Sequence, residues 1–216
     1  MSLFVKICGL CSESDVRAVA GLGPDAMGFV FWPGSKRAVV PADVAAWTRD
    51  LPPGILKVGV FVDASPEELE QTVREAGLDV VQLHFFQCLE KARENFPMIG
   101  KKIQNFSKHW KVVYLDQSEP GTEETAFVDA FLVDHYSAVS PGGTGQVADW
   151  AAARDFVRRC AKPVVLAGGL TPDNVAEAIR AVRPWGVDVS SGVELSPGRK
   201  DLKKVERFIK ICRENA

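Results

Sequence analysis

The sequence has no run of apolar residues that approaches the roughly 20 needed to cross a bilayer. Residues 1–10 also lack the basic segment and long apolar run of a signal peptide. Neither sign of charge is in excess, because 26 basic and 28 acidic residues leave a net charge of −2. We therefore expect a cytoplasmic protein with no membrane partner and no electrostatic preference for nucleic acid.

Cysteine is too sparse and too scattered to cross-link the chain, and an odd number of thiols predicts reduced cysteines. The five are Cys8, Cys11, Cys88, Cys160 and Cys212. Cys8 and Cys11 have C-x-x-C spacing, but no second pair completes a zinc site, and no other cluster suggests a metal. Two interpretations of this pair stay open. Oxidation could link the two sulfurs, or Cys11 is a small buried residue facing the first helix.

Pro/Ser-rich linkers and low-complexity segments are missing as well, so residues 1–216 are expected to form a single domain. With 46% hydrophobic and 25% charged residues, the composition is that of an ordinary globular protein. A chain of 216 residues is long enough to bury a substantial core.

What the sequence does contain is an alternation of short apolar runs with amphipathic segments, the pattern of a parallel sheet with crossover helices. Most of the runs are continuously apolar, which indicates strands covered on both faces. Eight strands are expected, at Phe4–Ile7, Ala26–Phe31, Lys57–Val62, Val80–Leu83, Met98–Ile103, Ala130–Asp134, Pro163–Ala167 and Gly186–Ser190.

Residues typical of helix ends indicate helices between these strands. Ser65, Pro66 and Glu68 form a capping box with proline at the first helical position, and Gly77 suits the helix end. Other helices are expected after Ser12, over Pro41–Leu51, over Asp149–Cys160, after Thr171–Asn174 and over Lys200–Arg213. Eight such modules in 216 residues predict a single-domain α/β fold, the (β/α)8 TIM barrel.

In such a barrel the catalytic groups stand at the carboxyl ends of the strands. Cys8 follows the first strand, although a cysteine there could equally be a small buried hydrophobe. Asp134 closes an apolar run, as either a loop cap or a catalytic acid. Arg37 suits a substrate carboxylate or simple solvation, and His84 could be a rim residue or a base.

Two glycine and serine turns near the end of the chain predict a phosphate site, because barrels commonly hold phosphate in the loops after strands seven and eight. The first turn contains Gly168 and Gly169, and the second contains Ser190, Ser191 and Gly192. A third glycine-rich run, Gly142–Gly145, lacks the lysine of a P-loop and is expected to cover the substrate.

The run Gly100–Lys111 is basic and aromatic. It could bind nucleic acid, or it is a solvated strand end and loop. Neither the overall charge nor a nucleic-acid motif supports the first interpretation, so we expect the second.

Taken in order, the motifs resemble the phosphoribosylanthranilate isomerase family over nearly the whole chain. They are Lys6–Gly9, Gly28–Phe31, Ser35–Arg37, Val58–Phe61, Val81–His84, Gly142–Gly145 and Val187–Glu194. The resemblance implies an Amadori rearrangement of N-(5-phosphoribosyl)anthranilate in tryptophan biosynthesis. It also implies that Cys8 is the general base, Asp134 the general acid and Arg37 the partner of the anthranilate carboxylate.

These roles imply a small-molecule phosphosugar partner and no cofactor, because the iminium formed on ring opening is its own electron sink. They also require a protonated Asp134 and a deprotonated Cys8, the reverse of their ordinary states, so both pKa values are expected to shift. We expect a monomer or a homodimer.

Two departures from the family pattern stand out. Phe85–Cys88 replaces glycine and acidic residues after His84, and Phe85 and Phe86 are expected to narrow the mouth of the site. Cys11 stands where threonine is common. Competing functions are another phosphosugar barrel, such as indole-glycerol-phosphate synthase or the histidine-pathway isomerase, and a non-catalytic phosphate-binding barrel. Cys8 in place of an aspartate, and the absence of internal duplication, disfavour the histidine-pathway enzyme.

Overall fold

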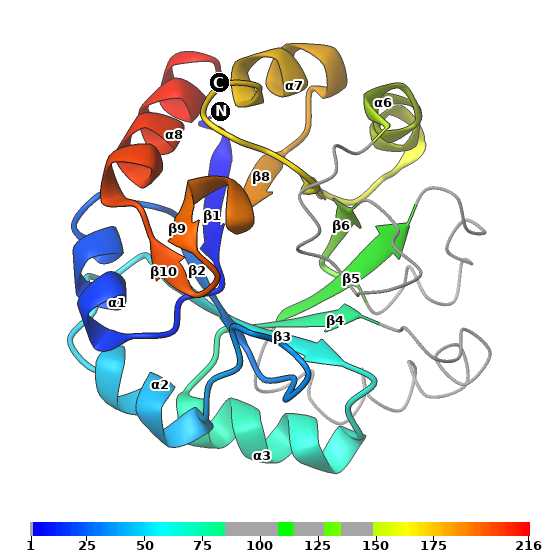
Figure 1. Cartoon of the computed structure of the whole chain (residues 1–216). Helices are drawn as coiled ribbons and strands as arrows, with labels where there is room; N and C mark the ends of the chain where they lie inside the picture. The colour runs from blue at the N-terminus through cyan, green and yellow to red at the C-terminus, as the bar shows by residue number, and fades with distance from the viewer. Residues whose placement is uncertain (1, 85–107, 115–127, 135–148) are drawn as a thin grey trace.

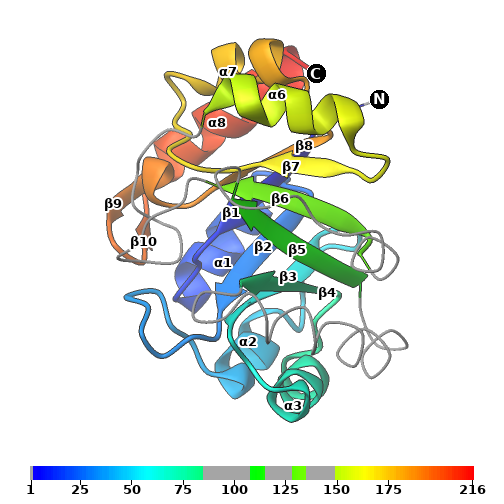
Figure 2. The same cartoon turned by 90° about the vertical axis from the view of Figure 1, so that its right-hand side faces the viewer.

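The computed structural model describes residues 2–84, 108–114, 128–134 and 149–216. Eight strands form a closed barrel in chain order, and β8 pairs with β1 (Figures 1 and 2). The strands are β1 (Phe4–Cys8), β2 (Ala26–Val30), β3 (Leu56–Val62), β4 (Val80–His84), β5 (Lys108–Tyr114), β6 (Ala130–Asp134), β7 (Val164–Leu166) and β8 (Gly186–Val189). All neighbouring pairs are parallel, so the predicted TIM-barrel class is confirmed.

The predicted fifth strand was wrong. We expected Met98–Ile103, which lies outside the described residues, whereas the barrel closes through Lys108–Tyr114. This segment pairs with β4 at Val80 and with β6 at Ala130. Its basic residues obscured the strand in the sequence, while Trp110, only 3% exposed, packs in the barrel.

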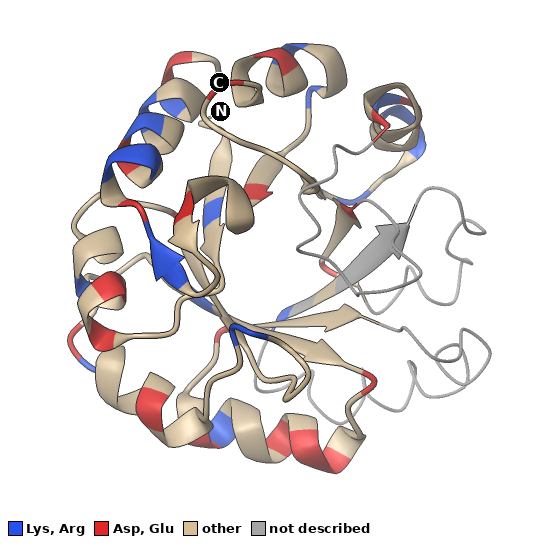
Figure 3. Cartoon of the chain, viewed as in Figure 1, with Lys and Arg blue, Asp and Glu red and all other residues tan. Residues whose placement is uncertain are grey.

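The described helices surround the barrel (Figure 1). They are α1 (Glu13–Ala20), α2 (Pro41–Trp47), α3 (Pro66–Ala76), α6 (Trp150–Arg159), α7 (Val175–Val182) and α8 (Leu202–Glu214). The capping box of Ser65 and Glu68 is confirmed, and Gly77 ends α3 with φ of 62°. Figure 3 shows charges of both signs on these helices. Within the described ranges no helix is long and apolar enough to span a membrane.

A short hairpin between β8 and α8 was not expected from the sequence. The single turn η1 (Ser191–Val193) leads into β9 (Glu194–Ser196), which pairs antiparallel with β10 (Arg199–Lys200). Helix α8 therefore begins at Leu202, capped by Asp201, rather than at Lys200. Figure 2 shows the hairpin at the end of the barrel toward which the strand arrows point.

Successive side chains of each strand alternate between the barrel interior and the outer core. In β1, Val5 and Ile7 belong to the outer core, whereas Phe4 packs against an apolar cluster inside the barrel. This interior cluster consists of Ala26, Val58, Val80, Trp110, Ala130, Leu132, Val165 and Ala167. The polar interior groups therefore gather above it, toward the carboxyl ends of the strands.

Candidate active site

A cavity of about 340 Å³ opens at the carboxyl ends of the strands. Four polar residues singled out from the sequence line it together with Ser190 of the second turn: Cys8, Arg37, His84 and Asp134. The structure thus brings into one space groups that are up to 182 positions apart in the chain. A cavity at this end of a barrel, with converging polar groups, is where a barrel enzyme binds its substrate.

Cys8 is the last residue of β1 and is 7% exposed. A Cβ atom added to Gly28 on the neighbouring strand would lie 2.6 Å from its sulfur, so only glycine leaves the thiol its space. Burial raises the pKa of the Cys8 thiol, and Lys6 opposes this increase without cancelling it. A base role for Cys8 was expected to require a lowered pKa, and the protein groups around the thiol do not lower it, because desolvation dominates.

Beneath Cys8 lies an ion pair that the sequence reasoning missed. Lys6 Nζ is 3.0 Å from Asp188 Oδ2, and the lysine side chain is completely buried. Asp188 lines the cavity, and its second oxygen, Oδ1, is buried with no hydrogen-bond partner among the described residues. The two residues are register partners on β1 and β8.

Asp134 is the last residue of β6 and is partly exposed. Strand β6 is separated from β1 by β7 and β8, so Asp134 and Cys8 approach the cavity from different sides. A proton donor and a proton acceptor placed on different sides of one cavity can act on two atoms of the same ligand.

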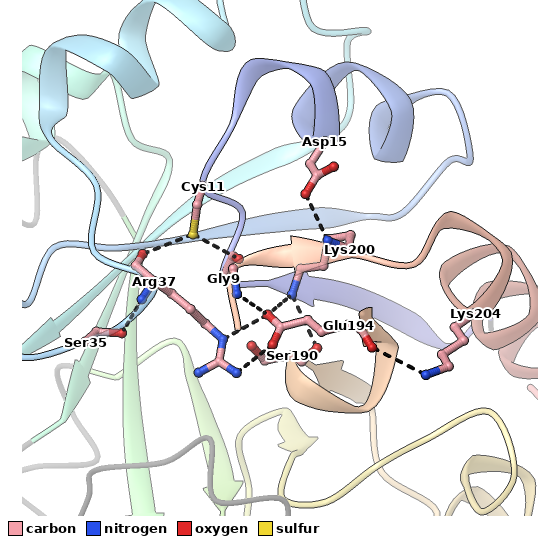
Figure 4. A network of polar contacts seen from close by, with 10 residues as sticks. Gly9, Cys11, Asp15, Ser35, Arg37, Ser190, Glu194, Lys200 and Lys204 are labelled. Atoms are coloured by element: carbon pink, nitrogen blue, oxygen red, sulfur yellow. Dashed lines mark hydrogen bonds and ion pairs between the residues drawn. The ribbon is translucent and has the colours of Figure 1, made fainter. Parts of the chain in front are cut away.

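Arg37 reaches the cavity from the loop after β2, and Glu194 of the hairpin holds it (Figure 4). Its Nε and Nη2 atoms donate to the two carboxylate oxygens of Glu194 at 2.9 and 2.7 Å. Glu194 thus occupies one edge of the planar guanidinium, and the remaining N–H groups belong to Nη1 and Nη2. The remaining N–H groups of an arginine oriented in this way can donate hydrogen bonds to a second carboxylate.

Lys200 completes this cluster from β10. Its Nζ donates to Glu194 Oε1 at 2.8 Å and to the Ser190 carbonyl at 3.3 Å, and its side chain is fully buried. Burial alone would raise the pKa of Glu194, but Arg37 and Lys200 hold it below its ordinary value. Glu194 therefore stays ionised, and the hairpin ties the loop after β2 to the turn after β8.

His84 ends β4 on the inner face of the barrel, where its Nε2 atom lies 3.1 Å from Nε2 of Gln82. Burial, assisted by the nearby Lys6 ammonium, lowers the pKa of His84 to about 3. The imidazole is therefore neutral at physiological pH.

We expect this histidine to make the protein less stable in mild acid. The unfolded chain binds a proton near pH 6.5, whereas the folded His84 does not until about pH 3. The unfolded state thus binds more protons in this window, and the free energy of unfolding falls as pH decreases, by about 2 kcal/mol from this group at pH 5. Urea unfolding of wild type and His84→Gln at pH 7 and pH 5 tests this, and an equal loss in both proteins would contradict it.

The two predicted phosphate turns meet above β7 and β8. A Cβ atom on Gly192 would come within 1.9 Å of the Leu170 carbonyl oxygen, so the approach of the two loops requires glycine there. Gly168 and Gly169 have φ of 85° and 62°. Within the described part of the chain, the backbone N–H groups of these three glycines donate none of the loop hydrogen bonds. Ser190 lines the cavity, whereas Gly168, Gly169, Ser191 and Gly192 are not among its lining residues.

Cys11 and Cys8 are both free thiols that face different neighbours. The Cys11 sulfur lies 3.5 Å from the carbonyl oxygens of Gly9 and Arg37 and would lie 3.2 Å from a Cβ atom on Gly198. Cys8 instead faces Gly28. This arrangement favours Cys11 as a packing residue, although its neighbours are Arg37 and the hairpin and not only α1.

Phe85, Phe86, Gly142–Gly145 and residues 100–107 of the basic run lie outside the described residues.

Comparison with known proteins gives a consistent result. Residues 5–211 match the family model described as N-(5'phosphoribosyl)anthranilate (PRA) isomerase. A protein of Trichlorobacter lovleyi named N-(5'-phosphoribosyl)anthranilate isomerase is 43% identical over 211 residues, which cover 97% of this chain and 98% of the relative.

Solved structures agree with the sequence relatives. The phosphoribosyl anthranilate isomerase of Thermus thermophilus superposes with a TM-score of 0.84 at 31% identity, covering 99% of this chain and all of the other. A second isomerase, solved in complex with reduced 1-(o-carboxyphenylamino)-1-deoxyribulose 5-phosphate, has a TM-score of 0.77 at 33% identity and covers 98% of this chain and 99% of its own.

Proposed function

Since this chain belongs to the N-(5'-phosphoribosyl)anthranilate isomerase family, we propose that its rearrangement takes place in the cavity between Cys8 and Asp134. The enzyme converts N-(5-phosphoribosyl)anthranilate to 1-(2-carboxyphenylamino)-1-deoxyribulose 5-phosphate in tryptophan biosynthesis. The observation that carries the site assignment is the convergence of Cys8, Asp134 and Arg37 on one cavity.

The first step opens the sugar ring. Protonated Asp134 donates its proton to the furanose oxygen, the bond from C1 to that oxygen breaks, and the anthranilate nitrogen lone pair forms the C1 iminium. A neutral carboxylic acid is needed here, because a carboxylate has no proton to give. Asp134 is left as the carboxylate.

The second step moves the double bond. The Cys8 thiolate takes the C2 proton, and the electron pair of that C–H bond flows to the iminium, giving an enolamine. The Asp134 carboxylate then takes the C2 hydroxyl proton and the Cys8 thiol gives its proton to C1, which completes the ketone and restores the acid and the thiolate. Burial raises the pKa of Cys8 in the substrate-free enzyme, so the thiolate that starts the cycle forms by loss of the thiol proton to water. The iminium cation formed beside the sulfur favours this thiolate.

Arg37 binds the anthranilate carboxylate in this proposal, and the phosphate lies at the other end of the substrate. The phosphate is held by the turns of Gly168–Gly169 and Ser190–Gly192, where glycine lets backbone N–H groups approach an anion. The mutual contact of these two turns at Gly192 and Leu170 supports one shared phosphate site.

We expect Arg37→Ala to raise KM by about ten- to hundredfold with a smaller change in kcat. A charge-assisted hydrogen bond contributes about 1.5–3 kcal/mol, and this one binds a part of the substrate that does not react. Arg49→Ala removes the same kind of charge from an exposed position that does not line the cavity, and serves as the control. Equal effects of the two substitutions would indicate general electrostatic attraction instead of a specific carboxylate site.

The isomerase assay tests the proposed function. Anthranilate-type fluorescence should disappear when purified enzyme meets freshly generated phosphoribosylanthranilate, and the turned-over product should be the carboxyphenylamino deoxyribulose phosphate. Binding of the substrate without any turnover would favour the non-catalytic phosphate-binding barrel.

We infer that residues 1–216 form one domain, that the enzyme is cytoplasmic, and that it is a monomer or homodimer with no nucleic-acid partner. The phosphoribosylanthranilate isomerase of Thermotoga maritima, of which a structure of generated monomers is solved, is described as dimeric, and this is the observation that favours a homodimer.

A further inference from the structure

The interior of a β/α barrel is ordinarily filled by apolar, branched side chains. Here the layer directly below the cavity instead holds Lys6, whose side chain is completely buried. Its ammonium pairs with Asp188 Oδ2 at 3.0 Å. A buried ion pair seldom stabilises a fold more than well-packed apolar residues of similar volume would, so stability alone does not account for this one.

Lys6 and Cys8 are two residues apart on one strand and therefore point to the same face. The contacts of Gly28 show how close they are. A Cβ atom added there would lie 2.6 Å from the Cys8 sulfur and 3.0 Å from Lys6 Cε, so both side chains border the same small volume. The lysine ammonium thus lies directly beneath the thiol.

We propose that Lys6 is a positioning residue for the base: its buried ammonium, held in place by Asp188, favours the thiolate form of Cys8. The proposal rests on the assignment of Cys8 as the proton acceptor in the proposed function. Lys6 need not touch the substrate, because it acts through the charge that it places next to the sulfur.

The charges around Cys8 come from several elements. Lys6 on β1 and Lys200 on β10 favour the thiolate, and Asp188 on β8 disfavours it. Arg37 after β2 also interacts with the Cys8 charge, and Glu194 partly neutralises Arg37. Burial raises the pKa of Cys8, and Lys6 is the strongest of the groups that oppose this. The pKa of Lys6 itself is raised, because Asp188 and Cys8 more than offset its burial, so the lysine stays charged.

Two substitutions are expected to change the alkylation rate of the Cys8 sulfur in opposite directions. Lys6→Met removes the cation and should slow alkylation of Cys8 by iodoacetamide about tenfold near pH 8, the equivalent of one pKa unit. Asp188→Asn removes the opposing anion, so alkylation should become several-fold faster. A packing role for the pair would move both rates in the same direction, since either change disturbs the same contacts.

The experiment follows alkylation of Cys8 in the full-length protein between pH 6 and pH 10 by peptide mass spectrometry, with Cys160 of the α6 end as an internal reference. Circular dichroism confirms that each variant is folded. Lys6→Met leaves Asp188 unpaired and could fail to fold, so the double variant Lys6→Met/Asp188→Asn is included. Compared with Asp188→Asn alone, it removes only the lysine charge and leaves no buried charge unpaired.

We expect the double variant to be alkylated about tenfold more slowly than Asp188→Asn. Equal rates in these two proteins would overturn the proposal, as would shifts of the same sign in Lys6→Met and Asp188→Asn. The readout is independent of turnover. If Cys8→Ser kept full isomerase activity, the assignment of the base would fail while the alkylation result would still report whether Lys6 favours the thiolate.

Discussion

Replacing Asp134 with asparagine is expected to lower kcat by at least about a hundredfold while the barrel stays folded. General acids typically contribute 10²–10⁴ in rate, and an amide of the same shape has no proton of suitable acidity to give to the furanose oxygen. The loss should appear equally in kcat and kcat/KM, because the proton is transferred only in the transition state.

Asp129→Asn is the matched control, since it makes the same chemical change just before β6 begins, at the opposite end of that strand from Asp134. Its turnover should remain close to that of wild type. Near-normal turnover in Asp134→Asn would show that another acid of the cavity protonates the furanose oxygen.

Cys8→Ser should have an effect of similar size. A serine hydroxyl is far less acidic than a thiol and offers almost no anion to accept the C2 proton. The substitution is small and lies at a site where Gly28 has already made room, so we expect the fold to be unaffected. Steady-state kinetics and thermal unfolding of the purified variant separate loss of chemistry from loss of structure.

Cys160→Ser provides the control for thiol loss, because Cys160 caps α6 and does not line the cavity. It should keep wild-type turnover. If Cys8→Ser did so too, the thiol would be a packing residue, which was one of the two interpretations that the sequence left open for it.

The barrel could be predicted from the sequence because its strands are continuous apolar runs and its helices carry strong caps. The capping box at Ser65 and the strand Ala130–Asp134 are both observed as expected. Strand β5 was misplaced for the opposite reason, since Lys108 and Lys111 interrupt its apolar character. The hairpin after β8 has only two short strands, and so little periodicity that no pattern marks it.

The polar residues at the ends of the strands were predicted from the sequence, but the ion pair of Lys6 and Asp188 one layer deeper was not. Lys6 precedes Cys8 by two positions, and Asp188 precedes Ser190 by two, so the period of a strand places each pair on one face. A lysine inside an otherwise apolar strand was the available signal. The partner of Arg37 could not have been found in this way, because Glu194 is 157 positions away and reaches it only through the hairpin.

A crystal structure of this enzyme with reduced 1-(o-carboxyphenylamino)-1-deoxyribulose 5-phosphate would show whether the reacting carbons lie between Cys8 and Asp134. We expect C2 next to the Cys8 sulfur, Asp134 on the opposite side of the sugar chain and the aromatic carboxylate on Arg37. The phosphate should lie against Gly169 and Ser190–Gly192. A bound product analogue whose sugar carbons contact neither Cys8 nor Asp134 would contradict the assignment.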